Sequence, residues 1–542
     1  MDKKKPDGFL KTSVSRILSM IFVLLYAFLF LTNLIGTTKI DMDYNIFCEY
    51  AHYDVKISPV ICILFIVNAV ISFFLYKSGI VEKINERLLK YFTAIAIMIM
   101  GLWWVLTTKG YPIADQELVS SISSSFLAGD YSKFNPGAYI NRYPFQLGII
   151  FIFECIYRVF GSGNHLSIMI LNSVLAAVIF LNLYSFVEQI IGKGKKLNYF
   201  SLFFLGCIAL PMHSFFVYGN MWGLFFSTSA VRMFCKTLDE KKIFSIRKAL
   251  YYLTSVLLFA AAIVAKNNCI IFLIGVVLCG TVHIICEKRE TSETKEAGIQ
   301  NSTAGKFINI LLCFGLLLSV AGIKPIYAYY ENASGMKIPD GIPKNAWIAM
   351  GLQEGIPEWG CGANGWYNDY TVSLFEANEF DSSLTKSAAH AYIIERLRYF
   401  KNNPGEAVSF YIEKILTQWC EPTFQSFWMI DVWDNHAELS PAVTDMLSGK
   451  TMIRISIFMR LFLLFVYFGN ALYYLFTVKE NDCINCIYSV IALGGFLFHI
   501  LWEAKAIYIL PYMVISTPTA LIGLIRLYEC AGGVLSRKKK AS

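Results

Sequence analysis

The chain has 542 residues, of which 56% are hydrophobic and only 16% charged, and its mean hydropathy is +0.52. This composition excludes an ordinary soluble globular protein and indicates a membrane protein. The net charge of +8 requires no nucleic-acid partner, because the basic residues gather where anionic lipid of the inner membrane face would attract them.

Apolar stretches recur along the whole chain, and nearly all of them reach the length of roughly 20 residues that a bilayer crossing needs. They must be helices, because a backbone in lipid has to satisfy its hydrogen bonds internally. We predict an all-α polytopic membrane protein with about 12 transmembrane helices, within a range of roughly 11 to 13. Representative stretches are residues 17–35, 57–76, 91–108, 166–187, 200–216, 250–265, 270–286, 307–328, 455–476, 484–502 and 508–525.

The charges of the connecting segments predict the orientation, because short loops rich in Lys and Arg stay in the cytoplasm. Both termini are basic, and the basic segments alternate with acidic or uncharged turns along the chain. We therefore expect a multi-pass protein of the cell (plasma) membrane with both termini cytoplasmic. The alternation requires that residues 143–160, which carry Glu154 and Arg158, lie along the outer membrane surface rather than cross it.

This topology divides the chain into seven parts and places two large segments on the outer face. The second of these is expected to be mainly helical, because residues 387–400 have helical spacing and Asn403-Pro404 is a typical helix start. The parts are membrane helices (1–108), the first outer loop with the interfacial helix (109–165), central membrane helices (166–286), a cytoplasmic linker (287–305), a membrane helix (306–328), an extracytoplasmic loop domain (329–452), and C-terminal membrane helices with a basic cytoplasmic tail (453–542).

Cysteine carries little functional information here, because most of the 14 cysteines lie inside apolar stretches. Cys483 and Cys486 have the spacing of a metal or redox pair, but no second pair matches them, which favours a structural role. Cys361 and Cys420 share the large outer loop, and whether they form a disulfide stays open.

The early part of the loop domain is rich in Gly, Asn and Trp and contains Trp359, Trp366, Tyr367 and Asp369. Aromatic rings beside amides and carboxylates suit a sugar, which needs an apolar face to stack on and polar partners for its hydroxyls. The alternative is a Gly-rich loop whose Trp residues enter the lipid headgroup layer. Both interpretations remain open.

Polar residues collect at the outer ends of the predicted helices. A single charge there can be a solvated or snorkelling side chain, but charges at membrane depth are costly and often mark a site. A carboxylate could remove a proton from an attacking hydroxyl, while Arg and Lys could neutralise a phosphate leaving group. The residues of this rim are Asp115, Glu117, Arg142, Tyr218, Asn220, Lys266, Glu503, Lys505 and Tyr508.

Several short segments of this rim carry a family resemblance. The first large outer loop contains Ala114-Asp115-Gln116-Glu117, and the interfacial helix begins with Arg142-Tyr143-Pro144. One helix ends at Lys266-Asn267, and the segment near the C-terminus, residues 502–511, reads WEAKAIYILP. The chain resembles the GT-C superfamily of membrane glycosyltransferases, particularly bacterial relatives of the protein O-mannosyltransferase and aminoarabinose transferase group. The chain departs from that family in four ways. The acidic loop follows the third span rather than the first, and Ala506-Ile507 stands where an Arg often precedes the Tyr. Asp115 is followed by Gln116 rather than by a second acid, and the large outer loop matches no catalytic pattern of the family.

The resemblance implies inverting transfer of a sugar from a polyprenyl-phosphate-linked donor to an envelope glycan, lipid or protein on the outer face. It implies catalytic roles for Asp115 and Glu117. A divalent ion (Mg²⁺ or Mn²⁺) near these two acids is a further hypothesis, which their spacing does not specify. The donor phosphate would be bound by Arg142, Lys266, Lys505 and Tyr508, and sugar or acceptor by Tyr218, Asn220, Trp359, Trp366, Tyr367, Asp369 and Glu503.

Three other functions remain as alternatives. A transporter or a lipid or glycan flippase would need ionisable residues near mid-bilayer and helices broken by Gly or Pro, whereas the polar groups here gather at one rim. A ligase or polymerase of envelope glycans would use similar chemistry on a larger donor. A non-catalytic scaffold would leave the placement of the rim residues unexplained.

Overall fold

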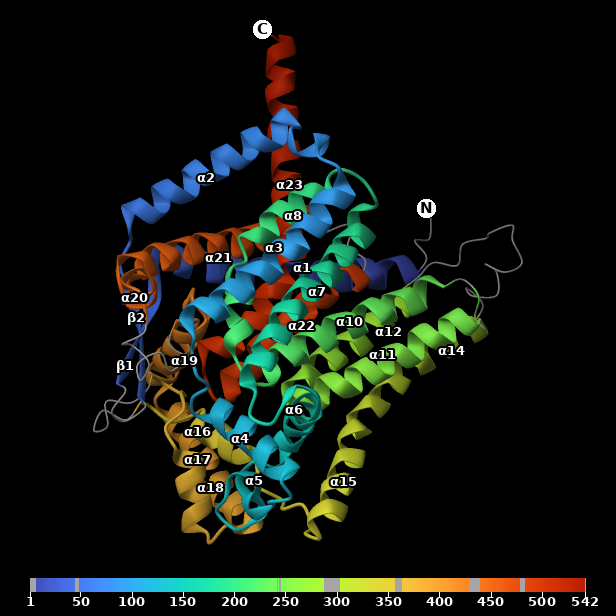
Figure 1. The fold of residues 1–542 in the computed structure, drawn as a ribbon. Helices are drawn as coiled ribbons and strands as arrows, with labels where there is room; N and C mark the ends of the chain where they lie inside the picture. The colour runs from blue at the N-terminus through green and yellow to red at the C-terminus, as the bar shows by residue number, and fades with distance from the viewer. Residues whose placement is uncertain are drawn as a thin grey trace.

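The computed structural model describes residues 6–43, 48–240, 242, 245–286, 303–355, 363–427, 439–477 and 483–541, and these are mainly helical (Figure 1). Within these residues, ten helical segments are long and apolar enough to cross a membrane, and up to twelve if each of two bent pairs counts as one span. The prediction of a helical polytopic membrane protein is therefore confirmed, with the expected number of about twelve at the upper end of this range.

The ten candidate spans lie on long helices, most of which pack into one bundle. Helix α2 is the exception, because it runs along the edge of the molecule with little of its surface buried (Figure 1). The helices are α1 (Pro6–Ile35), α2 (Pro59–Ser78), α3 (Glu86–Thr108), α7 (His165–Ile191), α11 (Ile246–Ala265), α12 (Ile270–Cys286, preceded by a 3₁₀ turn at Asn267–Cys269), α14 (Thr303–Gly315) continued by a 3₁₀ segment (Leu316–Ile323) and α15 (Lys324–Ser334), α21 (Lys450–Thr477), α22 (Ile487–Leu501, preceded by Cys483–Cys486) and α23 (Leu510–Ala541).

Two pairs of shorter helices are sharply bent. Helix α5 (Tyr139–Arg142), preceded by a 3₁₀ turn (Ser132–Phe134), meets the Pro144–Gln146 turn and α6 (Leu147–Phe160) at 100°, and α8 (Leu197–Leu205) meets α9 (Ala209–Met212) with the following turn (His213–Phe215) at 48°. The 14 residues of α6 measure about 21 Å, less than the ~30 Å hydrocarbon core. That α6 lies along the membrane surface stays a prediction, and its length agrees with it.

The remaining helices lie between or beside these spans. Helix α10 (Gly219–Asp239) is as long as a span but more polar, and it packs along α11. Helices α16, α17 and α18 pack together at the lower left of Figure 1, in the part predicted to be a helical loop domain. The bounds are α4 (Asp115–Leu127), α16 (Lys344–Met350), α17 (Tyr370–Ala377), α18 (Ser382–Asn402), α19 (Pro404–Trp419), α20 (Pro441–Ser448), and short 3₁₀ turns at Val81–Lys83 and Ala506–Tyr508.

A β-hairpin between α1 and α2 was missed by the sequence analysis, which treated residues 41–54 as one of the acidic or uncharged turns. Strands β1 (Gly36–Asp43) and β2 (Cys48–Val55) pair antiparallel, with Ile40 opposite Ala51 and Met42 opposite Glu49. Two strands alone are marginally stable in water, so this hairpin depends on the surface against which it packs. That surface includes α19, whose residue Leu416 accepts a 2.8 Å hydrogen bond from the Thr38 hydroxyl.

A buried arginine fixes the point where α1 gives way to the hairpin. The Arg460 guanidinium on α21 donates to the carbonyl oxygens of Asn33 at 2.7 and 3.0 Å and of Gly36 at 2.6 Å. The last carbonyls of a helix have no partner within the helix and carry its negative partial charge. A cation there donates the missing hydrogen bonds and also offsets that charge. Arg460 therefore sets where the chain leaves α1 and enters β1.

A buried asparagine plays the corresponding part at the break before α10. The Asn172 amide on α7 donates to the carbonyl oxygens of Ser214 at 3.1 Å and Phe216 at 3.0 Å. The backbone N–H of Val217 donates to Gln116 Oε1 at 2.9 Å. These bonds satisfy an unwound stretch that would otherwise leave buried polar groups unpaired, and they fix the position of Tyr218.

We expect Asn172→Leu to destabilise the protein, because two buried carbonyl oxygens lose their donor at a cost of roughly 1–3 kcal/mol each. The measurement is the midpoint of thermal unfolding in detergent. Asn68→Leu is the matched control, since the exposed Asn68 amide bonds only to Leu64 within its own helix α2. Equal midpoints for the two variants would contradict the assigned role of Asn172.

Candidate functional site

Asp115 is the first residue of α4, and its side chain is exposed. An acidic residue in the first turn suits the positive end of the helix. The preceding residue, Ala114, has φ = 50°, in the left-handed region that favours glycine. A non-glycine residue held in this conformation stores backbone strain, which occurs often at functional sites. The α4 start thus presents Asp115 at the end of a constrained turn.

Glu117 lies two residues further along α4 and is also exposed. Residues two apart on a helix point to opposite sides, about 200° around the axis. The helix therefore directs Glu117 away from the side on which Asp115 lies. The structure does not bring the two predicted catalytic acids together.

Lys266 follows the last residue of α11 and lies between two tyrosine rings. Its ammonium nitrogen is 4.2 Å from the centroid of the Tyr218 ring and 5.5 Å from that of Tyr508, a cation–π arrangement. Gly219 permits this approach, because a Cβ atom there would collide with the carbonyl oxygen of Ala265. The close contact between α10 and α11 therefore brings Tyr218 beneath Lys266.

Glu503 and Lys505 lie on the segment that joins α22 to α23. The Tyr508 hydroxyl donates to Glu503 at 3.4 Å, and the Lys505 ammonium lies 3.0 Å from Glu49 on β2. A backbone hydrogen bond of 2.8 Å from Ala504 N–H to the carbonyl of Gly365 joins this segment to the loop domain. The segment is therefore held between the hairpin and the loop domain.

These residues form one electrostatic group, which we call the Asp115 cluster. The charge of Asp115 acts on Lys266, Glu503, Lys505, Tyr218 and Tyr508, although these side chains come from three other parts of the chain. The cluster consists of Asp115, Tyr218, Lys266, Glu503, Lys505 and Tyr508. All six belong to the set predicted from the sequence.

Burial controls the ionisation of the cluster. It raises the pKa of Glu503 to about 7, because Lys505 and Lys266 only partly compensate for lost hydration. It lowers the pKa of Lys266 to about 8, against the opposing effect of Asp115 and Glu503. Burial would also lower the pKa of Lys505, but the carboxylates of Glu49, Glu503 and Asp115 outweigh it and raise that pKa. Lys505 therefore keeps its proton to a higher pH than Lys266 does.

The other predicted site residues are distributed around the cluster. Arg142 forms an ion pair with Glu376 on α17, at 2.5 Å, rather than joining the cluster. Asn220, in the first turn of α10, has a buried Oδ1 that finds no hydrogen-bond partner among the described residues.

The predicted sugar-binding aromatics separate into different environments. Trp366 is only 1% exposed and its indole N–H donates to Thr417, so it serves packing and cannot stack on a sugar in this structure. Tyr367 is exposed, donates to Asp369 at 2.8 Å, and has the Lys505 ammonium 5.7 Å from its ring centroid. Trp359 and Cys361 lie outside the described residues.

The sequence analysis missed several polar residues near the cluster. Glu49 pairs with Lys505, Gln425 donates to Glu49 at 3.2 Å, and the fully buried Lys414 of α19 donates to the carbonyl of Gly351. Burial lowers the pKa of Lys414 to about 7, against the effect of Glu503. Nothing in the sequence around Glu49 or Gln425 indicates that these residues lie near the cluster. Lys414 could have been noticed, because it is a charged residue within an apolar helical stretch.

A divalent metal does not fit the predicted acid pair, because α4 directs Asp115 and Glu117 to opposite sides. Among the described residues, no group of three or more His, Cys, Asp or Glu side chains is placed to hold a metal ion. The cations near Asp115 are lysines.

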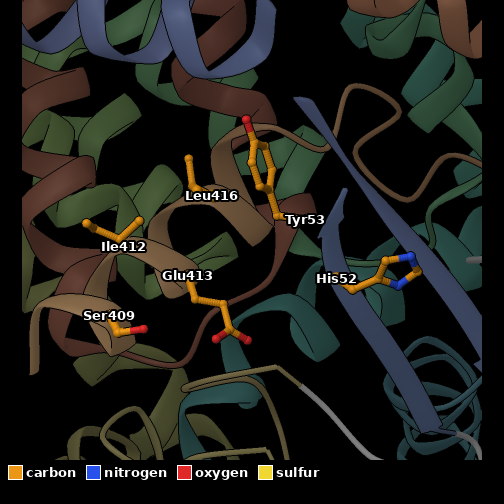
Figure 2. A pocket seen from close by; sticks show the side chains of 6 residues that line it. All are labelled: His52, Tyr53, Ser409, Ile412, Glu413 and Leu416. Carbon is orange, nitrogen blue, oxygen red and sulfur yellow. The ribbon is translucent and has the colours of Figure 1, made fainter. Parts of the chain in front are cut away.

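A shallow pocket of about 380 Å³ lies between the hairpin and α19. Figure 2 shows His52 and Tyr53 on the hairpin and four residues of α19 around it: Ser409, Ile412, Glu413 and Leu416. None of these residues belongs to the Asp115 cluster.

No protein-family model matches the chain, and no curated protein matches it. Among solved structures, the archaeal oligosaccharyltransferase AglB from Archaeoglobus fulgidus in complex with an inhibitory peptide and a dolichol-phosphate aligns with 83% of this chain and 52% of its own, at 12% identity and a TM-score of 0.39. The Archaeoglobus fulgidus oligosaccharyltransferase tethered with an acceptor peptide aligns with 80% of this chain and 49% of its own, at 10% identity and a TM-score of 0.39. The chain thus spans about half the length of these proteins, and a likeness at this level carries no argument about its fold or activity.

We expect Glu503→Gln to change how stability depends on pH. A folded pKa of about 7, against an ordinary 4.5, means that ionising Glu503 costs the folded state free energy. The contribution of wild-type Glu503 to stability therefore falls as the pH rises from about 4.5 to about 7, by roughly 3 kcal/mol in all. Glutamine does not ionise, so the variant should gain thermal stability relative to wild type between pH 5 and pH 8. The exposed Glu354 provides the control, because Glu354→Gln should show no such gain. A gap between Glu503→Gln and wild type that does not change with pH would contradict the assignment.

Proposed function

We propose that this protein is a membrane glycosyltransferase that moves a sugar from a polyprenyl-phosphate-linked donor to an acceptor hydroxyl at the outer face of the cell membrane. One observation carries the proposal: an exposed carboxylate, Asp115, shares an electrostatic group with two lysines at helix ends. Sugar transfer from a lipid phosphate needs both parts, a base for the acceptor and a cationic site for the departing phosphate.

In the proposed reaction, Asp115 takes the proton of the acceptor hydroxyl. The acceptor oxygen forms a bond to the anomeric carbon on the face opposite the phosphate, and the carbon–oxygen bond to the phosphate breaks. The bonding electron pair leaves with the phosphate oxygen, so the donor lipid departs as a phosphate anion. Inversion at the anomeric carbon follows from this single displacement.

Lys266 and Lys505 are suited to hold the departing phosphate. Both are partly buried, so water screens their charge less than it would at an open surface. Lys505 keeps its proton because three carboxylates surround it, and the rings of Tyr218 and Tyr508 hold Lys266 by cation–π contact. The rings restrict a side chain that is otherwise flexible.

For the sugar or the acceptor we propose two sets of partners. The buried Oδ1 of Asn220, which has no partner among the described residues, can accept a hydrogen bond from a hydroxyl. This bond would offset the free-energy cost of burying that oxygen without a partner. The exposed Tyr367 and Asp369 offer a ring face and a carboxylate near Lys505. The second set lies in the loop domain, so donor and acceptor could approach from different sides of the cluster.

Asp115→Asn should retain the donor lipid, because removal of the base stops transfer after the donor has bound. Mass spectrometry of lipids that co-purify in mild detergent should then find a polyprenyl phosphate carrying a sugar, at a higher level than in wild type. Glu117→Gln is the matched control, since its side chain leaves the opposite side of α4, and it should resemble wild type. Finding only bulk phospholipid in every sample, although the cells contain the donor, would count against a glycosyltransferase and favour a transporter or flippase.

A second substitution tests the phosphate site. Adding Lys266→Met to Asp115→Asn should reduce the retained donor at least tenfold, because a cation that contacts the phosphate is lost. Lys337→Met, at an exposed position of the loop domain, should leave retention unchanged. Equal retention in the presence and absence of Lys266 would show that this lysine does not bind the donor.

A further inference from the structure

The hairpin between the first two membrane helices contributes a charged residue to the Asp115 cluster. Glu49 Oε1 lies 3.0 Å from the Lys505 ammonium, and the two side chains are only 10% and 20% exposed. An ion pair this well buried differs from a surface pair, since removing one partner leaves the other charge without compensation. The contact joins residues 456 positions apart in the chain.

The register of β2 explains why Glu49 faces this site. Side chains two apart on a strand share a face, so Glu49 lies on the same face as Ala51. Ala51 is buried against Ala504 and Ala506, the residues on either side of Lys505. The inward face of β2 therefore packs on the segment between α22 and α23, and this packing brings Glu49 to Lys505.

Gln425 bonds both to Glu49 and to the backbone of the segment that carries Lys505. Its amide nitrogen donates to Glu49 Oε2 at 3.2 Å, and its amide oxygen accepts the backbone N–H of Ile507 at 3.1 Å. One side chain thus bonds to the hairpin carboxylate and to the backbone two residues beyond Lys505. Both carboxylate oxygens of Glu49 are engaged, which fixes its orientation.

We propose that Glu49 is a positioning residue for the sugar-transfer reaction, which holds the Lys505 ammonium in the Asp115 cluster. This inference rests on the proposed function, in which Lys505 stabilises the departing phosphate. A lysine has a flexible four-carbon stem and readily loses its proton when it is buried. Glu49 opposes both tendencies, because it accepts one hydrogen bond from the ammonium and supplies a compensating charge.

The groups around Lys505 show why Glu49 matters among them. Glu503, Asp115 and Glu49 all favour the charged form, and Glu49 has the largest effect of the three. Lys266 is a second cation in the same cluster, and the Tyr367 ring lies beyond the ammonium. The pKa of Glu503 is about 7, so its negative charge is incomplete near neutral pH. Glu49 is the carboxylate in direct contact with Lys505.

The test is the pH dependence of Lys505 acetylation by acetic anhydride, measured by mass spectrometry on the full-length protein in detergent. The reagent modifies only the unprotonated amine, so the midpoint of labelling reports the pKa of Lys505. Glu49→Gln should move this midpoint down by at least one pH unit, a tenfold loss of proton affinity. Glu49→Asp, which keeps the charge on a shorter side chain, should shift it less and guards against a folding defect in the first variant.

A reciprocal control is available at another ion pair. Lys196 pairs with Glu529 at 2.6 Å, and none of the cluster residues contacts that pair. Glu529→Gln should lower the labelling midpoint of Lys196 and leave that of Lys505 unchanged, whereas Glu49→Gln should do the reverse. An unchanged Lys505 midpoint in correctly folded Glu49→Gln would overturn the proposal.

The pH profile of sugar transfer supplies the second readout. In Glu49→Gln the activity should fall at a lower alkaline pH than in wild type. Adding Lys505→Arg should abolish this difference, because arginine keeps its proton without a neighbouring carboxylate. A uniform loss at every pH, not rescued by Lys505→Arg, would mean a purely structural role for Glu49. Absence of transfer by the wild type itself would refute the proposed function, while the labelling result would still decide whether Glu49 controls Lys505.

Discussion

Where a buried helix is interrupted, its unpaired backbone N–H and C=O groups must find other hydrogen-bond partners. The candidate site depends on how this chain provides those partners. Arg460 donates to carbonyl oxygens at the end of α1, just before the hairpin. Asn172 donates to two carbonyl oxygens just before Tyr218. Gln425 accepts a hydrogen bond from the N–H of Ile507, just before Tyr508. In each case a polar side chain from another part of the chain supplies the missing partner. Directly beyond each break lies a segment that carries Glu49 or a residue of the Asp115 cluster. The same bonds that make an interrupted helix tolerable therefore position the functional groups.

The sequence predicted the helical class and the six residues of the cluster, because both depend on patterns along the chain. Apolar length identifies a span, and a charge at the end of a span is conspicuous against its surroundings. Asp115, Lys266 and Lys505 could thus be selected without knowledge of their contacts. Glu117 was included as a second carboxylate at the same rim, but the helical period of α4 directs it away from Asp115. Trp366 was selected for its chemistry, but burial, which depends on packing, decides what an aromatic ring can contact.

The hairpin shows why the remainder could not be predicted. Its strands carry an irregular mixture of polar and apolar residues, and two strands alone are only marginally stable in water. They form because α19, the α1 terminus and the segment after α22 provide hydrogen-bond partners and a surface for Ala51. The partners on α19 and after α22 lie hundreds of residues away, so no local signal marks Glu49 as part of a site. The same holds for Gln425, whose two hydrogen bonds join separate parts of the chain.

If the proposed function is correct, the charges near the cluster also suggest how the protein would bind a donor that carries a negatively charged phosphate. Three lysines (Lys266, Lys414 and Lys505) face three carboxylates (Asp115, Glu49 and Glu503). A phosphate added to a balanced group brings an excess of negative charge into a poorly hydrated region, which is costly unless a proton is taken up. Glu503 is one group able to take it, because its pKa of about 7 lets it bind a proton near neutral pH, and Lys414 is another, since its pKa is also about 7. Nearby phosphate would raise the pKa of Glu503 further, so donor binding and protonation of Glu503 favour one another. When the donor lipid departs, the proton can be released and the charge balance of the unbound protein is restored.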